Sequence, residues 1–209
     1  CLAFLYKMHG KRLVIALSGL HGSGRTTYGR KLAKILKLKY HSIGRVFREV
    51  ARKMGIDLMK LTEMASKDAS IDKYVDEITK KKASEGNIVI EGNLAALMLP
   101  EEIKDNTVKI FLTAPLRERA SRIARREKIP YWKALNETKM REENEWRRYL
   151  KYYGINFKDY RIYDIIINTA VYGIEENTQI MLKFIKAWRE LKDGSDTASS
   201  RKNMHKVER

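Results

Sequence analysis

The chain has 209 residues, 44% of them hydrophobic, so it is long enough for one sizeable domain and is not a wholly disordered protein. Lys and Arg number 43 against 26 Asp and Glu, which gives a formal net charge of +17. So basic a surface favours anionic partners such as nucleotides, RNA or acidic membranes. The alternative is the solvated surface of a thermophilic protein, since 33% of the residues are charged and Gln179 is the only glutamine.

Cysteine usage and hydropathy indicate the compartment. Cys1 is the only cysteine, so no disulfide forms within the chain, which is typical of the reducing cytoplasm. No apolar run is long enough to cross a bilayer, so no membrane partner is predicted. The apolar opening of the chain is short and lacks the basic segment of a signal peptide, so it is predicted to be neither a signal peptide nor an anchor. Met8 comes just before the first predicted strand, and residues 1–11 are predicted to be an N-terminal extension.

Residues 12–18, RLVIALS, form a continuous apolar run that ends in a glycine-rich turn, which predicts a strand buried on both faces. Four later segments have strand character and complete a predicted five-stranded sheet: 39–42, 87–92, 108–114 and 163–169. Helical spacing predicts helices over 26–38, 43–55, 57–85, 115–128, 130–153 and 174–191.

Strands that alternate with helices predict an α/β fold, with a parallel sheet and helices on both faces. Two all-helical insertions, at about 43–85 and about 116–155, follow strands whose carboxyl ends face the glycine-rich turn. Ligands bind at those ends in open α/β sheets. The predicted domain covers 12–191. Residues 192–209 are polar, without apolar periodicity, and are predicted to be a disordered tail.

The turn after the first strand predicts a phosphate-binding loop. Gly19 to Thr26 matches G-x-x-x-x-G-K-S/T except that Arg25 replaces the lysine. Glycines let backbone N–H groups point at phosphate oxygens, and the following helix presents its positive end. Thr26 is placed to bind Mg²⁺. The predicted ATP-binding residues here are Gly19, Leu20, His21, Gly22, Ser23, Gly24, Arg25, Thr26 and Thr27.

Arg25 keeps the positive charge of the lysine and pairs well with phosphate, but its planar fork is longer and bulkier. A displacement of about 1 Å at a reacting group can cost about 100-fold in rate. We therefore expect nucleotide binding to survive the change more readily than fast turnover does.

Several segments in order resemble the archaeal-type cytidylate kinases: SGLHGSGRTT, HSIGRVFREVA, NIVIEGNLA, RASRIARRE and REENEWRRYLKYYGIN. The resemblance runs from about residue 12 to about 190. It implies a three-layer phosphate-loop kinase fold with a monophosphate-binding insertion and a lid. It also implies Mg²⁺-dependent transfer of the γ-phosphate of ATP to CMP or dCMP. The protein is expected to be a monomer. Two departures are Arg25, and Asn93 with Ala95-Ala96 where the family carries Arg and then Ser-Gly.

Transfer to a phosphate oxygen needs positioning and positive charge rather than a general base, so arginines are the candidates. The resemblance places Arg48 on the monophosphate, although a solvated helix arginine is the alternative. Ser42 either contacts the acceptor or caps a helix. Asn93 lies at the expected acceptor site without the charge that arginine would supply. Glu91, at a strand end, either binds a Mg²⁺-bound water or pairs with an arginine.

The predicted lid carries two arginine groups. Arg119, Arg122 and Arg126 share one helix face, and either contact adenine or the ATP phosphates or form a solvated basic face. In the second group, Glu145 lies between Arg141 and Arg148 on one face and could orient both toward phosphates. The alternative is a ladder of helix salt bridges. The catalytic candidates are thus Arg25, Arg122, Arg141 and Arg148, with Arg119 on ATP and Glu145 on the substrate.

Other polar groups receive structural interpretations. The ring of His21 is predicted to point to solvent, and the acidic residues Asp68, Asp72 and Asp76 are predicted to be solvated.

The leading hypothesis is a cytidylate kinase that closes its two insertions over ATP, Mg²⁺ and CMP. A related small-molecule kinase with another acceptor is the second hypothesis. The third is a basic nucleotide- or RNA-binding protein with weak transfer activity, and only the net charge supports RNA, since no RNA-binding motif is present.

Overall fold

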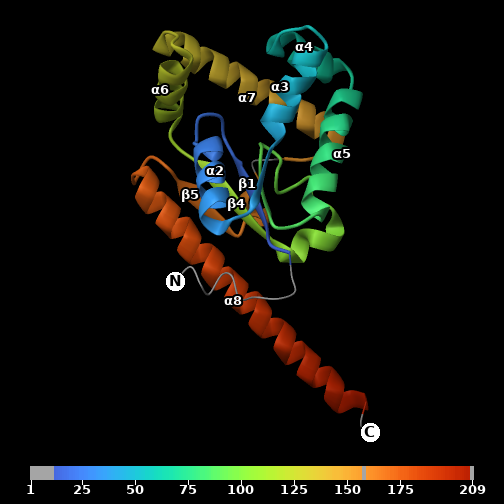
Figure 1. The fold of residues 1–209 in the computed structure, drawn as a ribbon. Coiled ribbons are helices and arrows are strands. Elements are labelled where there is room, and N and C mark those ends of the chain that lie inside the picture. The colour runs from blue at the N-terminus through green and yellow to red at the C-terminus, as the bar shows by residue number, and fades with distance from the viewer. Residues whose placement is uncertain (1–11, 157–158, 208–209) are drawn as a thin grey trace.

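Five parallel strands form one sheet in the order β2-β3-β1-β4-β5 (Figure 1). The strands are β1 (Val14–Gly19), β2 (Lys39–Ser42), β3 (Ile88–Glu91), β4 (Thr107–Thr113) and β5 (Ile165–Asn168). The bounds of all five differ from the predicted ranges by at most two residues, and the predicted α/β fold class is confirmed. The central position of β1 places the glycine-rich turn at the middle of the sheet, beside the carboxyl end of β3.

The structure, a computed structural model, describes residues 12–156 and 159–207, with side chains described as far as residue 193. The predicted N-terminal extension over 1–11 lies outside the described residues. No helix in the described ranges combines the length and the apolar character that a bilayer span requires.

Seven α-helices and two short 3-10 helices occupy the described connections. They are α2 (Arg25–Leu36), α3 (Ile43–Lys53), α4 (Leu58–Lys67), α5 (Ser70–Ser84), η1 (Glu101–Asn106), α6 (Leu116–Glu127), α7 (Tyr131–Tyr153), η2 (Tyr160–Ile162) and α8 (Ile174–Val207). The helical segment predicted over 57–85 is two helices, because Asp68 has extended backbone and its carboxylate accepts from the Ser70 N–H.

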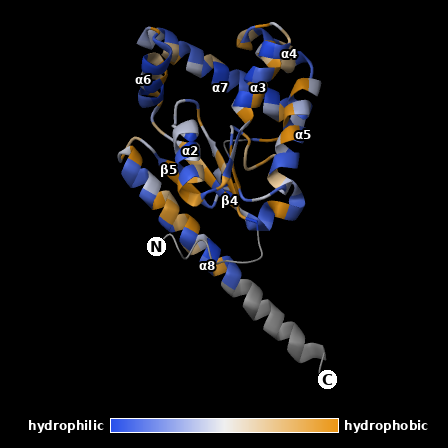
Figure 2. Ribbon diagram, in the orientation of Figure 1, coloured by the Kyte–Doolittle hydropathy of each residue, from blue (hydrophilic) through white to orange (hydrophobic). Residues whose placement is uncertain are grey.

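Alternate residues of each strand enter two separate hydrophobic cores, as the pleat of a β-strand requires. Leu13, Ile15 and Leu17 face α2 and α8, where Leu32, Met181 and Ile185 are fully buried. Val14 and Ala16 face the opposite side, where they pack with Ala83, Ile90 and Phe111. Figure 2 shows the strands as an apolar layer between helices with polar outer faces. The result is a three-layer arrangement.

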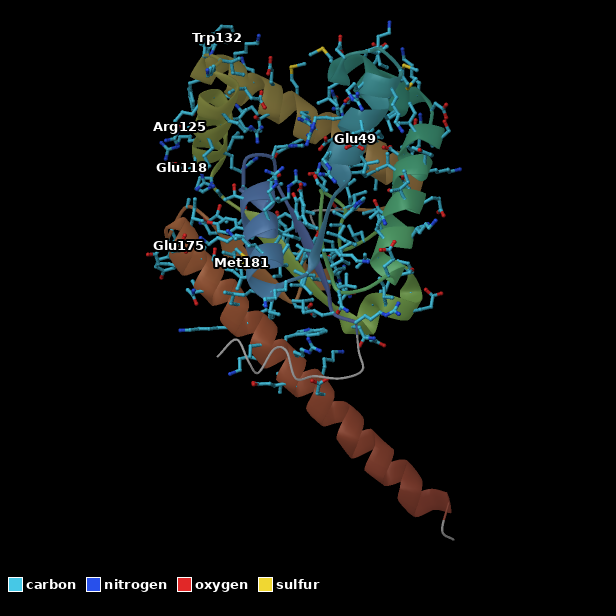
Figure 3. The ribbon with its side chains drawn as sticks, viewed as in Figure 1. Glu49, Glu118, Arg125, Trp132, Glu175 and Met181 are labelled. Atoms are coloured by element: carbon cyan, nitrogen blue, oxygen red, sulfur yellow. The ribbon has the colours of Figure 1, made fainter. Side chains whose placement is uncertain are left out.

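The helices predicted as insertions lie over the carboxyl end of the sheet. Helices α3 to α5 and the α6–α7 pair form two lobes on that side in Figure 1. Trp132, at the start of α7, is exposed at the outer end of one lobe (Figure 3). These positions leave the glycine-rich turn between the two lobes.

Helix α8 extends to Val207, well past the predicted end near residue 191. Its first part packs on the sheet, where Met181 points inward and Glu175 outward (Figure 3). Its later part projects from the body of the protein (Figure 1). The polar tail expected to be disordered is therefore helical through residue 207. Apolar periodicity does not detect such a segment, because extending an existing helix needs only one more backbone hydrogen bond per residue.

The glycine-rich turn uses backbone conformations that side chains disfavour. Gly22 and Gly24 have φ values of 77° and 95°. A Cβ on Gly22 would lie 2.6 Å from the carbonyl oxygen of Arg119, so α6 packs directly against the turn. The sequence requirement for glycine at residue 22 is therefore both conformational and steric.

Replacing Gly22 by Ala should destabilise the protein more than replacing Gly55 by Ala. Both glycines have positive φ, but a Cβ on Gly55 would meet no atom within 4 Å. We expect Gly55→Ala to cost about 1 to 2 kcal/mol from backbone strain, and Gly22→Ala about 1 to 3 kcal/mol more from overpacking. Urea denaturation measures both. Equal losses of stability in the two variants would show that the backbone of Arg119 shifts without cost to admit the new Cβ.

Candidate active site

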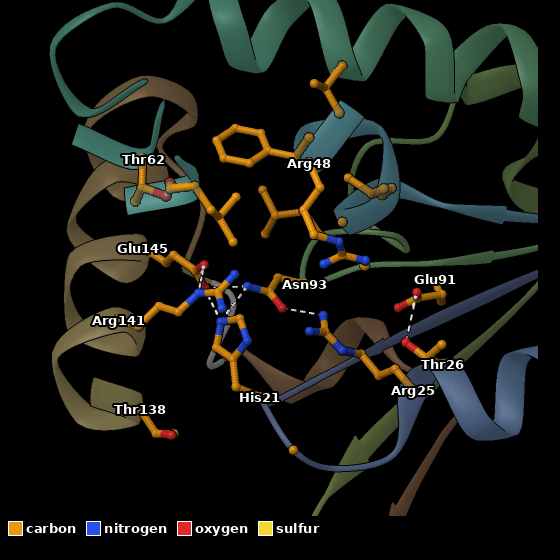
Figure 4. A pocket seen from close by; sticks show the side chains of 18 of the residues that line it. His21, Arg25, Thr26, Arg48, Thr62, Glu91, Asn93, Thr138, Arg141 and Glu145 are labelled. Atoms are coloured by element: carbon orange, nitrogen blue, oxygen red, sulfur yellow. Dashed lines mark hydrogen bonds and ion pairs between the residues drawn. The ribbon is translucent and has the colours of Figure 1, made fainter. Parts of the chain in front are cut away.

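A cavity of about 260 Å³ lies between the glycine-rich turn, the carboxyl end of β3, helices α3 to α5, and the α6–α7 lobe (Figure 4). Most of the predicted site residues line it. These are His21, Gly22, Gly24, Arg25, Thr26, Thr27, Arg48, Glu91, Asn93, Arg126, Arg141, Glu145 and Arg148. The tertiary structure thus brings together residues from four separate segments of the chain.

Arg25 opens α2 and reaches across the turn to the end of β3. One of its terminal guanidinium nitrogens donates to the side-chain oxygen of Asn93. Because lysine and arginine carry only donors, this contact requires an acceptor at residue 93, which an amide supplies and an arginine does not. The two departures from the family pattern are therefore in direct contact.

Asn93 also connects the turn to the lobe formed by α6 and α7. Its amide nitrogen donates to Oε2 of Glu145, and it lies 3.3 Å from Nε2 of His21. Glu145 in turn lies 2.6 Å from the His21 ring and accepts from Nε of Arg141 at 3.3 Å. The expectation that the His21 ring points to solvent is wrong, because the ring fills the space against Glu145.

The protonation states of Glu145 and His21 depend on burial and on the neighbouring charged groups. Burial raises the pKa of Glu145, but the His21 ring and the charges of Arg141 and Arg148 outweigh it, so the pKa lies below its ordinary value. The pKa of His21 is lowered, because its burial outweighs its attraction to Glu145. An ionised carboxylate and a neutral imidazole are therefore the stable pair at neutral pH.

Glu91 at the end of β3 accepts from three hydroxyl groups at one carboxylate oxygen. Thr26 donates at 3.2 Å, Tyr40 at 3.1 Å and Ser42 at 2.5 Å. Ser42 also caps α3, since its hydroxyl accepts from the Arg45 N–H. Ser42 is buried and does not line the cavity, so the structure shows its capping role and not a contact with an acceptor.

Thr26 and Glu91 suit the predicted Mg²⁺ ion. Both present oxygen at the cavity beside the first turn of α2, and Mg²⁺ prefers a few protein oxygens with the remainder from phosphates and water. The described residues contain no cluster of three or more His, Cys, Asp or Glu that would form a complete metal site without a nucleotide. The donor set is consistent with an ion that arrives with a nucleotide.

Two predicted phosphate ligands on α6 bind the turn itself instead. Arg119 is almost fully buried, and donates to the backbone carbonyls of His21 and Ala114 at 2.9 Å. Arg122 donates to the backbone carbonyl of Gly22 in the turn at 3.4 Å, and to both oxygens of Thr169, which follows β5, at 2.9 Å. Neither lines the cavity, whereas Arg126, also on α6, does. The reason is packing: α6 lies so close to the turn that the side chains nearest its start reach backbone.

Gly19, Leu20 and Ser23 also lie behind the cavity wall. Gly19 ends β1, Leu20 packs into two apolar clusters, and the Ser23 side chain is buried. Their predicted contribution to the site is therefore through the shape of the turn.

Arg148 and Asp72 form a buried ion pair between α7 and α5, with Nε and Oδ2 3.2 Å apart. The Arg148 guanidinium also lies near the rings of Phe47 and Tyr149. The expectation of a solvated acidic face is wrong for Asp72 and Asp76, which are 7% and 9% exposed and line the cavity.

A sequence signal for these aspartates exists. The buried residues of α5 recur at spacings of three and four, and two aspartates occupy such positions in the series Asp72, Val75, Asp76, Thr79 and Ala83. Arg48 on α3 is exposed at the cavity, and its side chain makes no hydrogen bond or ion pair with any other residue in the described part of the chain. Its side chain is thus available to a ligand.

A phosphate-binding turn after the central strand, with two helical lobes over the carboxyl end of a parallel sheet, defines a phosphate-loop kinase fold. The comparisons with known proteins specify the family. A family model described as "Cytidylate kinase-like family" matches residues 14–171. The chain belongs to this family, which confirms the resemblance found in the sequence.

Two curated relatives named cytidylate kinase illustrate the similarity. The protein of Staphylothermus marinus is 41% identical over 174 residues, which are 83% of this chain and 97% of that protein. The protein of Ignicoccus hospitalis is 43% identical over 162 residues, 78% of this chain and 92% of that protein.

Solved structures share the fold at lower identity. An uncharacterised protein from Eubacterium ventriosum aligns with a TM-score of 0.65 at 22% identity, covering 84% of this chain and 99% of that chain. Shikimate kinase from Bacteroides thetaiotaomicron aligns with a TM-score of 0.56 at 15% identity, again with 84% and 99% coverage. These likenesses concern the fold alone.

The ionisation of Asp72 should make stability depend on pH. Burial raises the pKa of Asp72 from 3.8 to about 6, despite Arg148. The folded state therefore holds this proton more tightly than the unfolded state does, and the Asp72 contribution to stability falls as the pH rises from about 4 to 6. Since one pH unit corresponds to about 1.4 kcal/mol, the full effect is up to about 3 kcal/mol.

Urea denaturation of wild type and Asp72→Asn at pH 4.5 and pH 7 measures this contribution. The free energy of unfolding of the variant, relative to wild type, should increase toward pH 7. Glu77→Gln is the control, because Glu77 is exposed on the same helix, and its difference from wild type should stay constant. A constant difference for Asp72→Asn as well would contradict the raised pKa.

Proposed function

We propose that the protein transfers the γ-phosphoryl group of ATP to CMP or dCMP, giving ADP and CDP or dCDP. The observation that carries the proposal is one cavity that joins the phosphate loop to cations from both lobes. Arg25 lies at the loop, Arg48 on α3 and Arg141 on α7. Membership of the cytidylate kinase-like family, and relatives of that name, support CMP as the acceptor.

In the proposed reaction an oxygen of the CMP phosphate attacks the γ-phosphorus of ATP, and the bond to the β-phosphate oxygen breaks. The attacking oxygen is already ionised near neutral pH, so the protein supplies orientation and positive charge rather than a base. The turn and the positive end of α2 receive the ATP phosphates. Arg48 receives the CMP phosphate, and Arg141, oriented by Glu145, neutralises charge between the two.

Thr26 and Glu91 would hold Mg²⁺, which when bound neutralises charge on the ATP phosphates and fixes their orientation. The three hydroxyl donors to Glu91 keep its carboxylate in one position at the end of β3. The fixed carboxylate and the first turn of α2 would together set the position of the Mg²⁺-bound phosphates.

Contacts across the cavity join the elements that surround it, and such contacts would help to exclude water from the bound substrates. The network from Asn93 to Glu145 and His21 joins β3, α7 and the turn, and the Asp72–Arg148 pair joins α5 to α7. Closure over both substrates would prevent hydrolysis of the γ-phosphate. A monomeric state and a cytoplasmic location stay predictions from the sequence, as does RNA binding, for which the net charge is the only argument.

Acceptor selectivity tests the proposal directly. With ATP and Mg²⁺ present, ADP release should be fast with CMP or dCMP and at least about tenfold slower with UMP, AMP or GMP, since each 1.4 kcal/mol of recognition is worth tenfold. A coupled assay for ADP measures the rates. Fast release with a different acceptor would identify a related kinase instead, and no release with tight, salt-sensitive RNA binding would favour the nucleic-acid hypothesis.

The contact between Arg25 and Asn93 predicts that Arg25→Lys lowers turnover. A lysine keeps the charge but cannot reach Asn93 with a planar fork while also contacting phosphate. We expect kcat to fall about 10- to 100-fold, with a smaller change in the affinity for ATP. Arg30→Lys, a change of the same chemistry on the exposed side of α2, is the control. A rise in kcat would show that Arg25 slows the reaction and that its contact with Asn93 does not assist transfer.

A further inference from the structure

The side chain of Arg25 is directed away from the glycine-rich turn. Arg25 opens α2, yet one terminal nitrogen of its guanidinium group donates to the side-chain oxygen of Asn93, which lies just past the end of β3. Figure 4 shows the side chain extending across the cavity toward Asn93. Among the described side chains, Arg25 makes no other hydrogen bond and no ion pair. The remaining donors of its planar fork are therefore available to a ligand in the cavity, which Arg25 lines.

Asn93 holds this fork in one direction. The amide nitrogen of Asn93 donates to Oε2 of Glu145, and a carboxylate can only accept, so the carboxamide oxygen of Asn93 must face Arg25. Arg25 is the one donor to that oxygen among the described residues. If Arg25 turned back toward the phosphate loop, the half-buried oxygen would lose its hydrogen bond. The network from Glu145 through Asn93 thus keeps the Arg25 guanidinium at the end of β3.

Arg48 approaches the same part of the cavity from α3. Both arginines line the cavity, and Figure 4 shows their guanidinium groups directed toward one another beside Asn93. Neither is paired with a carboxylate among the described residues, and Glu91 nearby on β3 already accepts from three hydroxyl groups. Two cations that face each other in this way repel, and a multiply charged anion bound by both would remove the repulsion.

The chemistry of two facing guanidinium groups matches a terminal phosphate. A phosphate monoester carries a charge near −2 at neutral pH and three acceptor oxygens, and a guanidinium fork binds two of them at once. The phosphates of ATP have other donors, because the backbone N–H groups of the turn and the positive end of α2 receive them. The fork at the end of β3 is therefore not required for the ATP phosphates.

We propose that Arg25 binds the phosphate of the acceptor nucleotide together with Arg48, and that Asn93 is the residue that positions Arg25 for this contact. The proposal rests on the proposed function. It assigns the cation of the phosphate loop to the acceptor, and it leaves ATP to the turn, to α2 and to the Mg²⁺ ion. The competing explanation is that Arg25 contacts the β- and γ-phosphates of ATP, as the lysine of a phosphate loop does.

The two explanations predict losses in different affinities, so calorimetric binding of CMP and of ATP with Mg²⁺ to Arg25→Ala separates them. We expect the Kd for CMP to rise at least about tenfold and the Kd for ATP to change less than about threefold, because a charge-assisted contact is lost only from the acceptor. Arg30→Ala is the matched control, since Arg30 is exposed on the same helix and does not line the cavity. A loss for ATP that equals or exceeds the loss for CMP, or no loss for either, would overturn the proposal.

Cytidine, which lacks the phosphate, shows whether Arg25 acts on the phosphate or on the cavity as a whole. Its affinity should be the same for wild type and Arg25→Ala, and an equal loss for cytidine and CMP would refute the phosphate contact. These affinities also separate this proposal from the proposed function. Wild type that binds CMP but releases no ADP would refute the reaction, whereas the affinities of Arg25→Ala would still decide the role of Arg25.

The positioning role of Asn93 is tested by moving the guanidinium from one side chain to the other. In Arg25→Lys the charge stays, but the fork at the end of β3 is lost. Adding Asn93→Arg to that variant returns a guanidinium to this place, so kcat/KM for CMP should recover at least about tenfold relative to Arg25→Lys. Asn93→Arg alone places two cations together without an acceptor between them, and its kcat/KM for CMP should fall below that of wild type. Losses that simply add in the double variant would contradict a shared role, because a merely structural contact gives no rescue.

Discussion

Gly22 and Gly24 adopt φ values of 77° and 95°, and the whole site depends on the bend that these residues allow between β1 and α2. The bend directs the positive end of α2 into the cavity, with Arg25 and Thr26 on its first turn. It also leaves no room at Gly22 for a side chain, because α6 packs against it. A single backbone conformation thus fixes both the anion site and the approach of one lobe.

The polar contacts across the cavity form one connected group. The carboxamide of Asn93 accepts from Arg25 and donates to Glu145, which is the pairing that only a side chain with both an acceptor and a donor can make. Arginine at both residues 25 and 93 would place two cations together without an acceptor between them. The two departures from the family pattern are therefore physically consistent with each other, although each by itself is unexpected.

The part of the cavity lined by α5 and α7 shows a cost in stability that is typical of functional sites. Burial of Asp72 outweighs its attraction to Arg148, whereas for Glu145 the surrounding positive charges outweigh burial. Two carboxylates on the wall of one cavity thus have opposite pKa shifts. The difference follows from the number of cations and donors within reach, not from depth alone.

Periodicity and glycine placement in the sequence determined the strands, most helix positions and the phosphate loop, because these depend on local geometry and on one face being buried. The order of strands, the contact of Arg25 with Asn93, and the turning of Arg119 and Arg122 toward the loop backbone were decided only by the tertiary structure. Asp72 makes the distinction clear: its spacing on α5 matches the buried face, but its polarity suggests solvent. Whether a charged side chain is buried depends on a partner from another segment, here Arg148 on α7, and spacing along one helix carries no information about that partner.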